Sequence, residues 1–232
     1  MIRTAVVIAA GEGRRLRPVT ERWPKPVLPI DGRPVIVTLL RALAEAGVDR
    51  IWVVVGHLGD QVRALAGGLG LDIRFVEQPR ADGSADAVQR ALDEGAEPPL
   101  LVTAADTVFG HGDLAAFAAA AAAHDGGIAG RRHPPPSPPH RYPLEVREGL
   151  VRRVLGEDGA DGLAAAPLWL LGEKVAARLC EDEAPYELAS AFQAAIDDGA
   201  AIAGVEIGPT RDLTDPLDLM HENVPYLRGL GV

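Results

Sequence analysis

A loop rich in glycine and in cations, placed directly after a short apolar run, constrains this chain more than any other feature. The run Thr4–Ala9 is apolar, rich in β-branched residues and ended by a loop with glycines, which is typical of a strand buried on both faces. We therefore predict the central strand of a parallel sheet here. Gly11 and Gly13 remove Cβ atoms where the chain turns, so backbone N–H groups can approach an anion closely.

Fixed positive charge follows the glycines. Arg14, Arg15 and Arg17 come next, and Lys25 stands in a Pro-Lys-Pro segment. A surface turn with solvated arginines would explain Gly-x-Gly alone, but four cations after a buried strand favour a polyphosphate site. Two other glycine signatures do not fit, which disfavours a dinucleotide-dependent oxidoreductase. A dinucleotide fingerprint needs a third glycine where Leu16 stands, and a P-loop needs Gly-Lys-Ser/Thr, which the sequence lacks.

The overall charge excludes several classes of partner. The 232 residues include 23 Lys and Arg against 33 Asp and Glu, a formal net charge of −10. An acidic chain of this kind is not expected to bind nucleic acid or anionic membranes. Cys180 is the only cysteine, so no intramolecular disulfide can form. Without a signal peptide or a stretch of membrane-spanning length, a cytoplasmic protein is expected, and the sequence is compatible with a homo-oligomer.

Segments typical of strands and helices alternate along the first half. We predict helices at 34–46, 58–65, 84–94 and 113–123, and strands at 50–55, 72–76 and 100–104. Ser84 and Asp113 are expected to cap their helices. This βαβ order predicts an α/β fold with a doubly wound, mostly parallel sheet, whose ligand crevice lies at the carboxyl ends of the strands.

The second half begins with a proline-rich run at 133–143, HPPPSPPHRYP, which predicts an exposed loop. Beyond it we predict a β-hairpin from 144–147 and 150–155, a strand at 165–171, helices at 172–180 and 186–198, and a strand at 202–205. A last helix is expected from Pro216 onward, with Asp215 as its N-cap.

The span 9–36, AAGEGRRLRPVTERWPKPVLPIDGRPVI, resembles the signature of the sugar-1-phosphate nucleotidyltransferases, or NDP-sugar pyrophosphorylases, G-x-G-T-R-L-x-P-L-T…P-K-P-L-L-P-[VI]-x-G-x-P-[LM]-I. The resemblance implies a Rossmann-like fold of the nucleotide-diphospho-sugar transferase type. It implies that a nucleoside triphosphate and a sugar-1-phosphate are joined to an NDP-sugar with release of pyrophosphate. Arg15 and Lys25 are the catalytic residues that it implies, and Mg²⁺ is the cofactor.

Nucleotide binding is implied for the glycine loop and for a second segment. The second segment, EQPRADGSA at 77–85, resembles the family's Q-P-x-x-x-G-[TL]-A. Its glutamine can offer a donor and an acceptor to a base, and its glycine lets the backbone lie close to that base. Taken singly, these two are equally an ordinary loop amide and an ordinary turn glycine. The residues expected to bind the nucleotide are Ala10, Gly11, Gly13, Arg14, Gln78 and Gly83.

Two carboxylates are expected to hold Mg²⁺. Asp106 follows the apolar strand at 100–104, which places it at the same sheet edge as the glycine loop, and aspartate is a good ligand for a hard divalent cation. It matches the family's strand-Gly-Asp motif, with Ala105 in place of the glycine. Asp212 lies in GPTRDLTDP, which resembles W-x-D-I-G-T-P-E-D-L and would complete the site. In general, an aspartate at the end of a strand is a turn former or a helix cap about as often as it is a metal ligand.

The acceptor segments depart from the family, because neither its E-K-P nor its N-A-G segment is intact. The nearest equivalents are VLGED at 154–158, which lacks the lysine, and AAP at 165–167. Glu157 is the candidate acceptor-binding residue. These departures leave two alternatives open: transfer to a non-sugar phosphorylated small molecule, or a catalytically silent nucleotide- or sugar-phosphate-binding regulatory subunit.

The resemblance also suggests how the chain is divided. We expect one nucleotidyltransferase domain over 1–232, with a nucleotide-binding part at 1–130 and a smaller acceptor-binding lobe at 131–185. The C-terminal helices at 186–232 would then complete the metal site.

Overall fold

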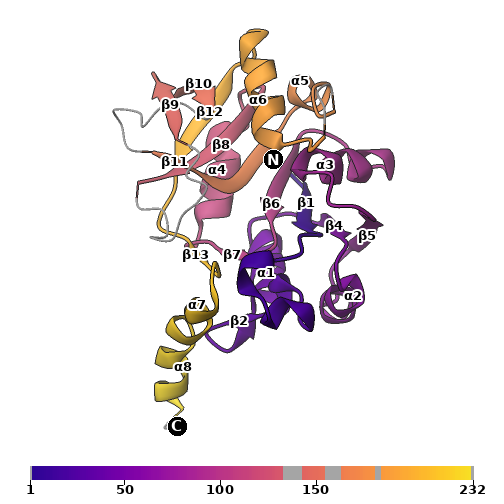
Figure 1. The fold of residues 1–232 in the computed structure, drawn as a ribbon. Helices are drawn as coiled ribbons and strands as arrows, with labels where there is room; N and C mark the ends of the chain where they lie inside the picture. The colour runs from indigo at the N-terminus through magenta and orange to yellow at the C-terminus, as the bar shows by residue number, and fades with distance from the viewer. Residues whose placement is uncertain (1, 133–142, 155–162, 181–183, 231–232) are drawn as a thin grey trace.

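The computed structural model describes residues 2–132, 143–154, 163–180 and 184–230. At its centre is a nine-stranded sheet with the order β5-β4-β1-β6-β11-β8-β12-β10-β9 (Figure 1). Its strands are β1 (Thr4–Ala9), β4 (Arg50–Val55), β5 (Ile73–Glu77), β6 (Leu100–Ala104), β8 (Gly126–Arg131), β9 (Leu144–Arg147), β10 (Leu150–Val154), β11 (Ala164–Leu171) and β12 (Ile202–Glu206). The predicted strands and the predicted hairpin are confirmed within one or two residues at each end.

The sheet is mixed but mostly parallel, as predicted. Strands β5, β4, β1 and β6 pair in parallel, and so do β8 and β12. Strand β11 is antiparallel to both β6 and β8, and β10 is antiparallel to both β12 and β9. The carboxyl ends of β5, β4, β1 and β6 therefore meet at one edge, where the crevice was expected.

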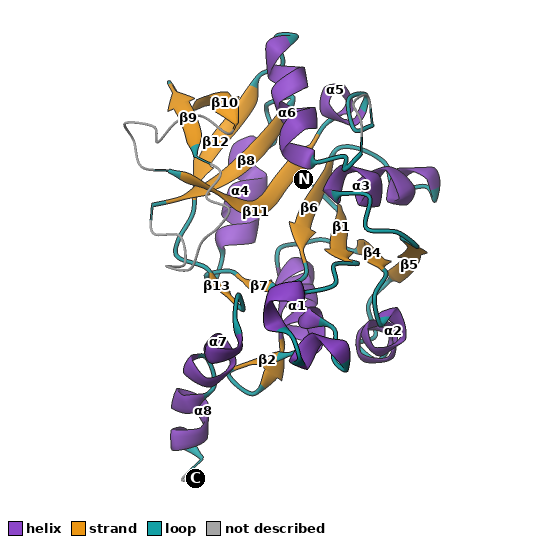
Figure 2. Ribbon diagram, viewed as in Figure 1, coloured by secondary structure: helices purple, strands orange, loops and turns teal. Residues whose placement is uncertain are grey.

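Helices cover both faces of the sheet, which makes the fold doubly wound (Figure 2). Alternate residues of the strands face opposite sides, so Val6 packs in the core under α3, α5 and α6, whereas Val7 packs in the core under α1, α2 and α4. The helices are α1 (Val35–Glu45), α2 (Gly59–Gly67), α3 (Ser84–Asp93), α4 (Asp113–Ala121), α5 (Glu173–Ala176), α6 (Leu188–Asp197), α7 (Pro216–His221) and α8 (Val224–Gly229).

Strand β8 was not predicted, because glycine carries little strand signal. The glycines are needed for close packing. A Cβ atom at Gly127 would lie 2.6 Å from the Cβ of Ala121 in α4, and one at Gly126 would lie 2.9 Å from the carbonyl oxygen of Leu170 in β11. Since real Cβ atoms do not approach other atoms so closely, the strand can lie between α4 and β11 only with glycine at these positions.

Two predicted helix caps are wrong. The N-cap of α4 is Gly112 rather than Asp113, and the N-cap of α3 is Gly83 rather than Ser84. The Ser84 hydroxyl instead accepts a hydrogen bond from the backbone N–H of Leu188, the first residue of α6, at 2.9 Å. This residue therefore links α3 to the start of a helix one hundred residues away in the chain.

The single C-terminal helix that was expected is divided into α7 and α8, which project from the body of the molecule (Figure 1). Asp215 caps α7 as predicted, and its carboxylate accepts from the backbone N–H groups of Leu217 and Asp218. The break falls at Asn223, whose side-chain amide donates to the carbonyl of Pro29 at 2.8 Å. The C-terminal segment is thereby fixed to the short hairpin of β2 (Pro29–Ile30) and β3 (Arg33–Pro34).

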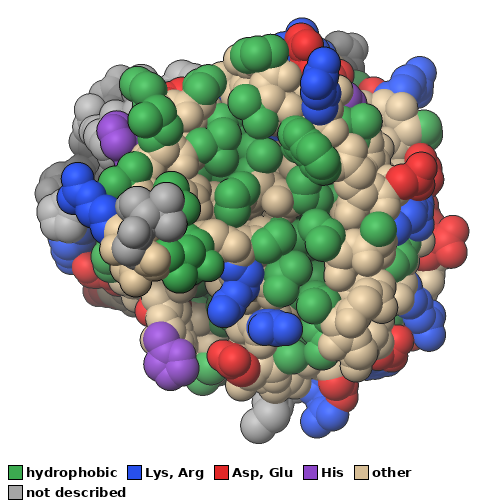
Figure 3. All heavy atoms as spheres, turned by 90° about the horizontal axis from the view of Figure 1, so that it is seen from below, with side chains coloured by type: hydrophobic (Ala, Val, Ile, Leu, Met, Phe, Trp, Pro, Cys, Tyr) green, Lys and Arg blue, Asp and Glu red, His purple; other side chains and the backbone are tan. Residues whose placement is uncertain are grey.

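Seen from below Figure 1, hydrophobic side chains are spread over the middle of the surface, among backbone and polar groups and with some cationic side chains between them (Figure 3). Most of the acidic side chains in this view lie nearer its rim (Figure 3). The helices of the described residues include none that is both long and apolar enough to cross a bilayer. Most of the predicted proline-rich loop, residues 133–142, lies outside the described residues.

Candidate active site

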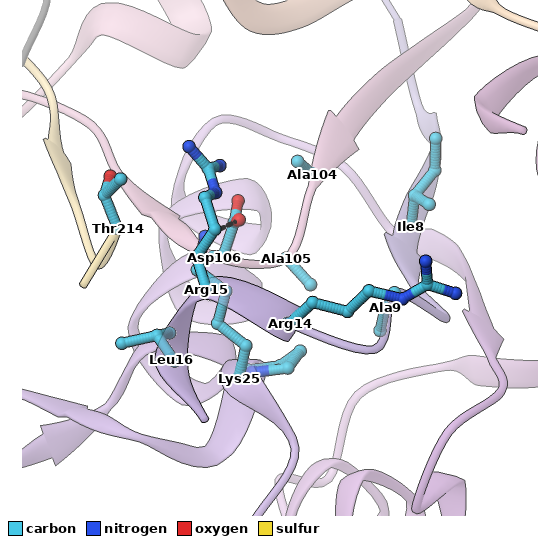
Figure 4. A pocket seen from close by; sticks show the side chains of 13 residues that line it. Ile8, Ala9, Arg14, Arg15, Leu16, Lys25, Ala104, Ala105, Asp106 and Thr214 are labelled. Carbon is cyan, nitrogen blue, oxygen red and sulfur yellow. Dashed lines mark hydrogen bonds and ion pairs between the residues drawn. The ribbon is translucent and has the colours of Figure 1, made fainter. Parts of the chain in front are cut away.

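A pocket of about 350 Å³ opens at the carboxyl ends of β1 and β6. It is formed where the glycine loop, the Pro-Lys-Pro segment and the residues after β6 meet (Figure 4). The structure thus brings together most of the residues expected to handle phosphate. The predicted site residues that line the pocket are Gly11, Gly13, Arg14, Arg15, Lys25 and Asp106.

The two glycines of the loop have different physical roles. Gly13 adopts a left-handed conformation with φ of 62°, and a Cβ atom there would lie 2.9 Å from the side chain of Thr20. The buried Thr20 hydroxyl also donates to the Gly13 carbonyl at 2.9 Å, a contact that the sequence analysis did not identify. Gly11 has open space around it, so its missing side chain leaves the pocket wall uncovered. The loop is therefore closely packed at Gly13 and open at Gly11.

Lys25 and Asp106 form an ion pair inside the pocket. Lys25 begins a short 3₁₀ helix (Lys25–Val27), and its ammonium points toward the Asp106 carboxylate (Figure 4). The side chains are 14% and 28% exposed, respectively. Burial works to raise the pKa of Asp106, but the Lys25 ammonium outweighs it, so the net pKa lies below the ordinary value. Asp106 is therefore a carboxylate at neutral pH, and the other charged residues that line the pocket are the cations Arg14, Arg15 and Lys25.

Arg14 is oriented differently from Lys25. Arg14 reaches toward Ala9 at the end of β1, away from Asp106 (Figure 4), and its guanidinium donates to Glu12 at 2.8 Å. Arg17 also lies 3.4 Å from Glu12, a residue that the sequence analysis did not single out. Glu12 therefore offsets part of the positive charge of the loop. Arg15 lines the same pocket.

The second predicted metal ligand, Asp212, is brought close to the first by a small sheet. Strand β13 (Arg211–Asp212) pairs antiparallel with β7 (Thr107–Val108), and this register sets Asp212 opposite Thr107. The buried Thr107 hydroxyl lies 2.5 Å from one Asp212 carboxylate oxygen and 3.3 Å from one of Asp106. Two carboxylates that are 106 residues apart in the chain thus contact the same hydroxyl group.

Asp212 is not among the residues that line the pocket, and it is already paired. Its other carboxylate oxygen accepts from the Arg131 guanidinium at 2.8 Å and from the Thr210 hydroxyl at 3.1 Å. Both side chains of the Arg131–Asp212 pair are only 12% exposed. Arg131 ends β8, the strand that the sequence did not predict, so no signal marked this arginine as part of the site.

The donor atoms suit a hard divalent cation. The oxygens of Asp106 and Asp212 lie around the Thr107 hydroxyl, and Mg²⁺ is commonly held by one or two carboxylates together with phosphate oxygens and water. Among the described residues, no three His, Cys, Asp or Glu side chains gather into a metal cluster. A cation at this position would therefore take its remaining ligands from substrate and solvent. Its presence remains a prediction.

The predicted base-binding residues lie further along the same sheet edge. Gln78 follows β5, and its backbone N–H donates to Val55 at the end of β4. A Cβ atom on Gly56 would lie 2.9 Å from the Ala10 carbonyl oxygen and 3.0 Å from that of Gln78. Ala10, Gly56 and Gln78 are therefore contiguous, and Gly56 is a member of this surface that the sequence analysis missed.

Gly83 is required by the packing of its own loop, and its role in binding the base stays a prediction. Its φ is 108°, and a Cβ atom would lie 2.1 Å from the Tyr186 carbonyl oxygen. The same carbonyl accepts from the Ala85 N–H at 2.8 Å, and the Tyr186 N–H donates to Asp82. The segment before α6 thus holds the loop before α3 in place. The candidate acceptor residue, Glu157, lies outside the described residues.

Comparison with known proteins gives a family match over most of the chain. The family described as MobA-like NTP transferase domain matches residues 5–170. One relative, the CMP-5'-(3-aminopropyl)phosphonate synthase of Streptomyces rubellomurinus, is 48% identical over 77 residues, which cover 32% of this chain and 12% of that protein. Another, the glucose-1-phosphate thymidylyltransferase of Streptomyces antibioticus, is 40% identical over 87 residues, 36% of this chain and 24% of that protein.

Solved structures agree on the fold. The UDP-glucose pyrophosphorylase from Acinetobacter baumannii superposes with a TM-score of 0.81 at 19% sequence identity, covering 97% of this chain and 93% of that one. The curated relatives above match this chain over less than a third of their own lengths. The superposition confirms the predicted nucleotide-diphospho-sugar transferase type of sheet.

Proposed function

Because the chain belongs to the MobA-like NTP transferase domain family, we propose that it joins a nucleoside triphosphate to a sugar-1-phosphate, giving an NDP-sugar and pyrophosphate. The observation that carries this proposal is the pocket in which an open glycine loop faces the Lys25–Asp106 pair. Such a pocket combines backbone donors, cationic side chains and a carboxylate, which together suit the transfer of a phosphate-bearing group.

The proposed reaction is a direct displacement. An oxygen of the acceptor phosphate attacks the α-phosphorus of the nucleotide, a new P–O bond forms, and the bond from that phosphorus to the β-phosphate bridging oxygen breaks. Pyrophosphate leaves with the electron pair. Such transfers depend on alignment and on neutralisation of oxygen charge, so no covalent enzyme intermediate is required.

The proposed roles of the side chains follow from their positions. Arg15 would hold the triphosphate and the leaving pyrophosphate, since it lines the pocket beside the glycine loop. Lys25 would bridge the α-phosphate and the acceptor phosphate. Its ammonium now binds the Asp106 carboxylate, and a phosphate oxygen is an alternative anionic partner within reach of the same flexible side chain.

Asp106 and Asp212 would hold Mg²⁺, with Thr107 keeping the two carboxylates together. When bound, the cation would neutralise charge on the α-phosphate oxygens. We place the reaction in the cytoplasm, as expected from the sequence.

A second candidate acceptor is a non-sugar phosphate or phosphonate. It is favoured by the printed name of the Streptomyces rubellomurinus relative, a CMP-aminopropylphosphonate synthase, and by the missing lysine of the acceptor segment at 154–158. The name of the Streptomyces antibioticus relative and that of the superposed structure favour a sugar-1-phosphate. The acceptor lobe at 131–185, with Glu157, is the part of the chain expected to decide between them.

The test is pyrophosphate release with Mg²⁺ across nucleoside triphosphates and a panel of sugar-1-phosphates, phospho-alcohols and aminoalkylphosphonates. The Asp106→Asn variant serves as the control. Acceptor-dependent release that the variant loses would support the proposal and identify both substrates. Binding of a triphosphate without release for any acceptor would overturn it in favour of a silent binding subunit.

A further inference from the structure

The Gln78 side chain lies at the far end of the edge that begins at the phosphate loop. Neighbouring strands are about 4.8 Å apart, so the ends of β1 and β5 are separated by roughly 10 Å, with β4 between them. Asp106 lies on the opposite side of β1, after β6. If the triphosphate occupies the pocket, as the proposed function requires, the base extends past Ala10 and Gly56 toward Gln78.

The orientation of the Gln78 amide is fixed by two acceptors. Its nitrogen lies 3.0 Å from the Gly83 carbonyl oxygen and 2.8 Å from a carboxylate oxygen of Asp86. Neither group can donate, so the atom between them must be the NH₂ group, and both of its hydrogens are used. Only the side-chain oxygen, which accepts and cannot donate, remains to be offered to a ligand.

Asp86 is itself firmly held. It lies in the first turn of α3, and the same carboxylate oxygen accepts from the Arg90 guanidinium one turn later at 2.8 Å. The two side chains are 15% and 33% exposed. Burial works to raise the pKa of Asp86, but the hydrogen bonds from Arg90 and Gln78 outweigh it and the net pKa is lowered. Asp86 is therefore charged at neutral pH and remains an acceptor.

We propose that Asp86 is a positioning residue that selects the nucleobase, because it holds the Gln78 NH₂ group and leaves the side-chain oxygen as the atom available to the ligand. The two classes of base present opposite patterns on their pairing edges. Cytosine and adenine carry an amino donor beside a ring-nitrogen acceptor, whereas uracil, thymine and guanine carry a carbonyl acceptor beside a ring N–H donor. An acceptor at a fixed position matches one pattern and faces another acceptor in the other.

Removing Asp86 relaxes this selection. Without the carboxylate, the amide of Gln78 can rotate by 180° and present its NH₂ group instead, with Gly83 alone opposing the rotation. The rotated NH₂ group can then donate to the nucleotide that wild type disfavours, so this nucleotide no longer faces an unpaired acceptor. Since leaving a buried polar group unpaired is a large part of what rejects a wrong substrate, we expect selectivity to change on the order of tenfold.

The experiment measures kcat/KM for CTP, UTP, ATP and GTP in the full chain with the acceptor that supports the fastest turnover. Wild type is compared with Asp86→Ala and with Asp93→Ala, a matched control on the same helix. The Asp93 carboxylate accepts an exposed hydrogen bond from the Gln89 side chain. Within the pair that contains the preferred nucleotide, CTP with UTP or ATP with GTP, the ratio of kcat/KM for the preferred to that for the disfavoured nucleotide should fall about tenfold in Asp86→Ala. It should stay unchanged in the control.

The outcomes separate this inference from the proposed function. An unchanged ratio in a folded Asp86→Ala protein would overturn the role of Asp86, whereas no turnover by wild type with any nucleotide and acceptor would overturn the proposed function itself. If Asp86→Ala fails to fold, Asp86→Ala combined with Arg90→Leu removes both members of the ion pair. The same ratio is then measured in the double variant. A fall of about tenfold supports the role of Asp86, and an unchanged ratio overturns it.

Discussion

Two ion pairs, Lys25–Asp106 and Arg131–Asp212, lie on either side of Thr107 and differ in their access to the pocket. Lys25 and Asp106 line it, and Asp106 is 28% exposed. Arg131 and Asp212 do not line it, and Asp212 also accepts from two hydroxyl groups. A substrate or a cation can reach Asp106 and displace Lys25 from it. To bind Asp212, a cation would have to displace Arg131 or a hydroxyl group from a carboxylate that is largely shielded from solvent. We call Lys25–Asp106 the exchangeable pair, because a ligand can replace one of its members, and Arg131–Asp212 the persistent pair.

Lys25→Ala is expected to have the largest effect, since it removes the exchangeable cation of the first pair. Turnover should fall by roughly a hundredfold or more, the scale for losing one preorganised charge in an active site. Steady-state pyrophosphate release measures it. Lys174→Ala is the matched control, because Lys174 bonds Asp125 in an exposed ion pair away from the pocket. Turnover near the wild-type value in Lys25→Ala would show that the pair is not catalytic.

Substituting Asp106, in the exchangeable pair, should lower activity more than substituting Asp212, in the persistent pair. Asp106→Asn should lose activity by about a hundredfold or more, and Asp212→Asn by about tenfold, because the buried arrangement of Asp212 leaves it the weaker cation ligand. Turnover is measured over a range of Mg²⁺ concentrations. Equal losses, or a larger one in Asp212→Asn, would contradict the distinction between an exchangeable and a persistent pair.

Arg131→Gln tests the persistent pair. Removing the guanidinium leaves the Asp212 carboxylate buried without its charge partner, which should lower the free energy of unfolding by about 3 kcal/mol without Mg²⁺. The freed carboxylate should then bind Mg²⁺ more tightly than in wild type, so added Mg²⁺ should raise Tm more in the variant. Thermal unfolding with and without Mg²⁺ measures both effects. The same Mg²⁺-induced rise in Tm for both proteins would mean that Arg131 does not compete for Asp212.

The smallest effect concerns a third ion pair, Asp86–Arg90, at the base end of the edge. The pKa of Asp86 is lowered in the folded state, so its contribution to stability is present above the unfolded value of about 3.9 and is lost as the pH falls through the folded value. The difference in Tm between wild type and Asp86→Ala should be constant from pH 8 to 5 and should shrink below about pH 4. A difference that grows on acidification would contradict the direction of the shift.

The sequence predicted the parallel half of the molecule well, for a physical reason. Continuous apolar runs such as Thr4–Ala9 predict buried strands, and parallel strands with helical crossovers place Gly11, Asp106 and Gln78 at one edge without further information. The pocket confirms that Gly11, Lys25 and Asp106 lie together.

Other parts could not be predicted because they depend on tertiary contacts. Strand β8 contains glycines that are explained only by its packing against α4 and β11, so nothing in the sequence indicated that Arg131 belongs to the site. Thr107 was not singled out from the sequence, because its contact with both carboxylates requires the pairing of β7 with the distant β13. Ser84 has the right residue type for a cap but bonds to a helix that begins at Leu188. In each case the deciding partner is remote in the chain.

The most direct test of the account follows the label of an [α-³²P] nucleoside triphosphate in the presence of Mg²⁺ and the acceptor panel. We predict that wild type transfers the label to the acceptor product, that unlabelled pyrophosphate is released in equal amount, and that Asp106→Asn transfers almost none. Label that stays in the triphosphate with every acceptor, or transfer by Asp106→Asn at the wild-type rate, would contradict a nucleotidyltransferase centred on the Lys25–Asp106 pocket.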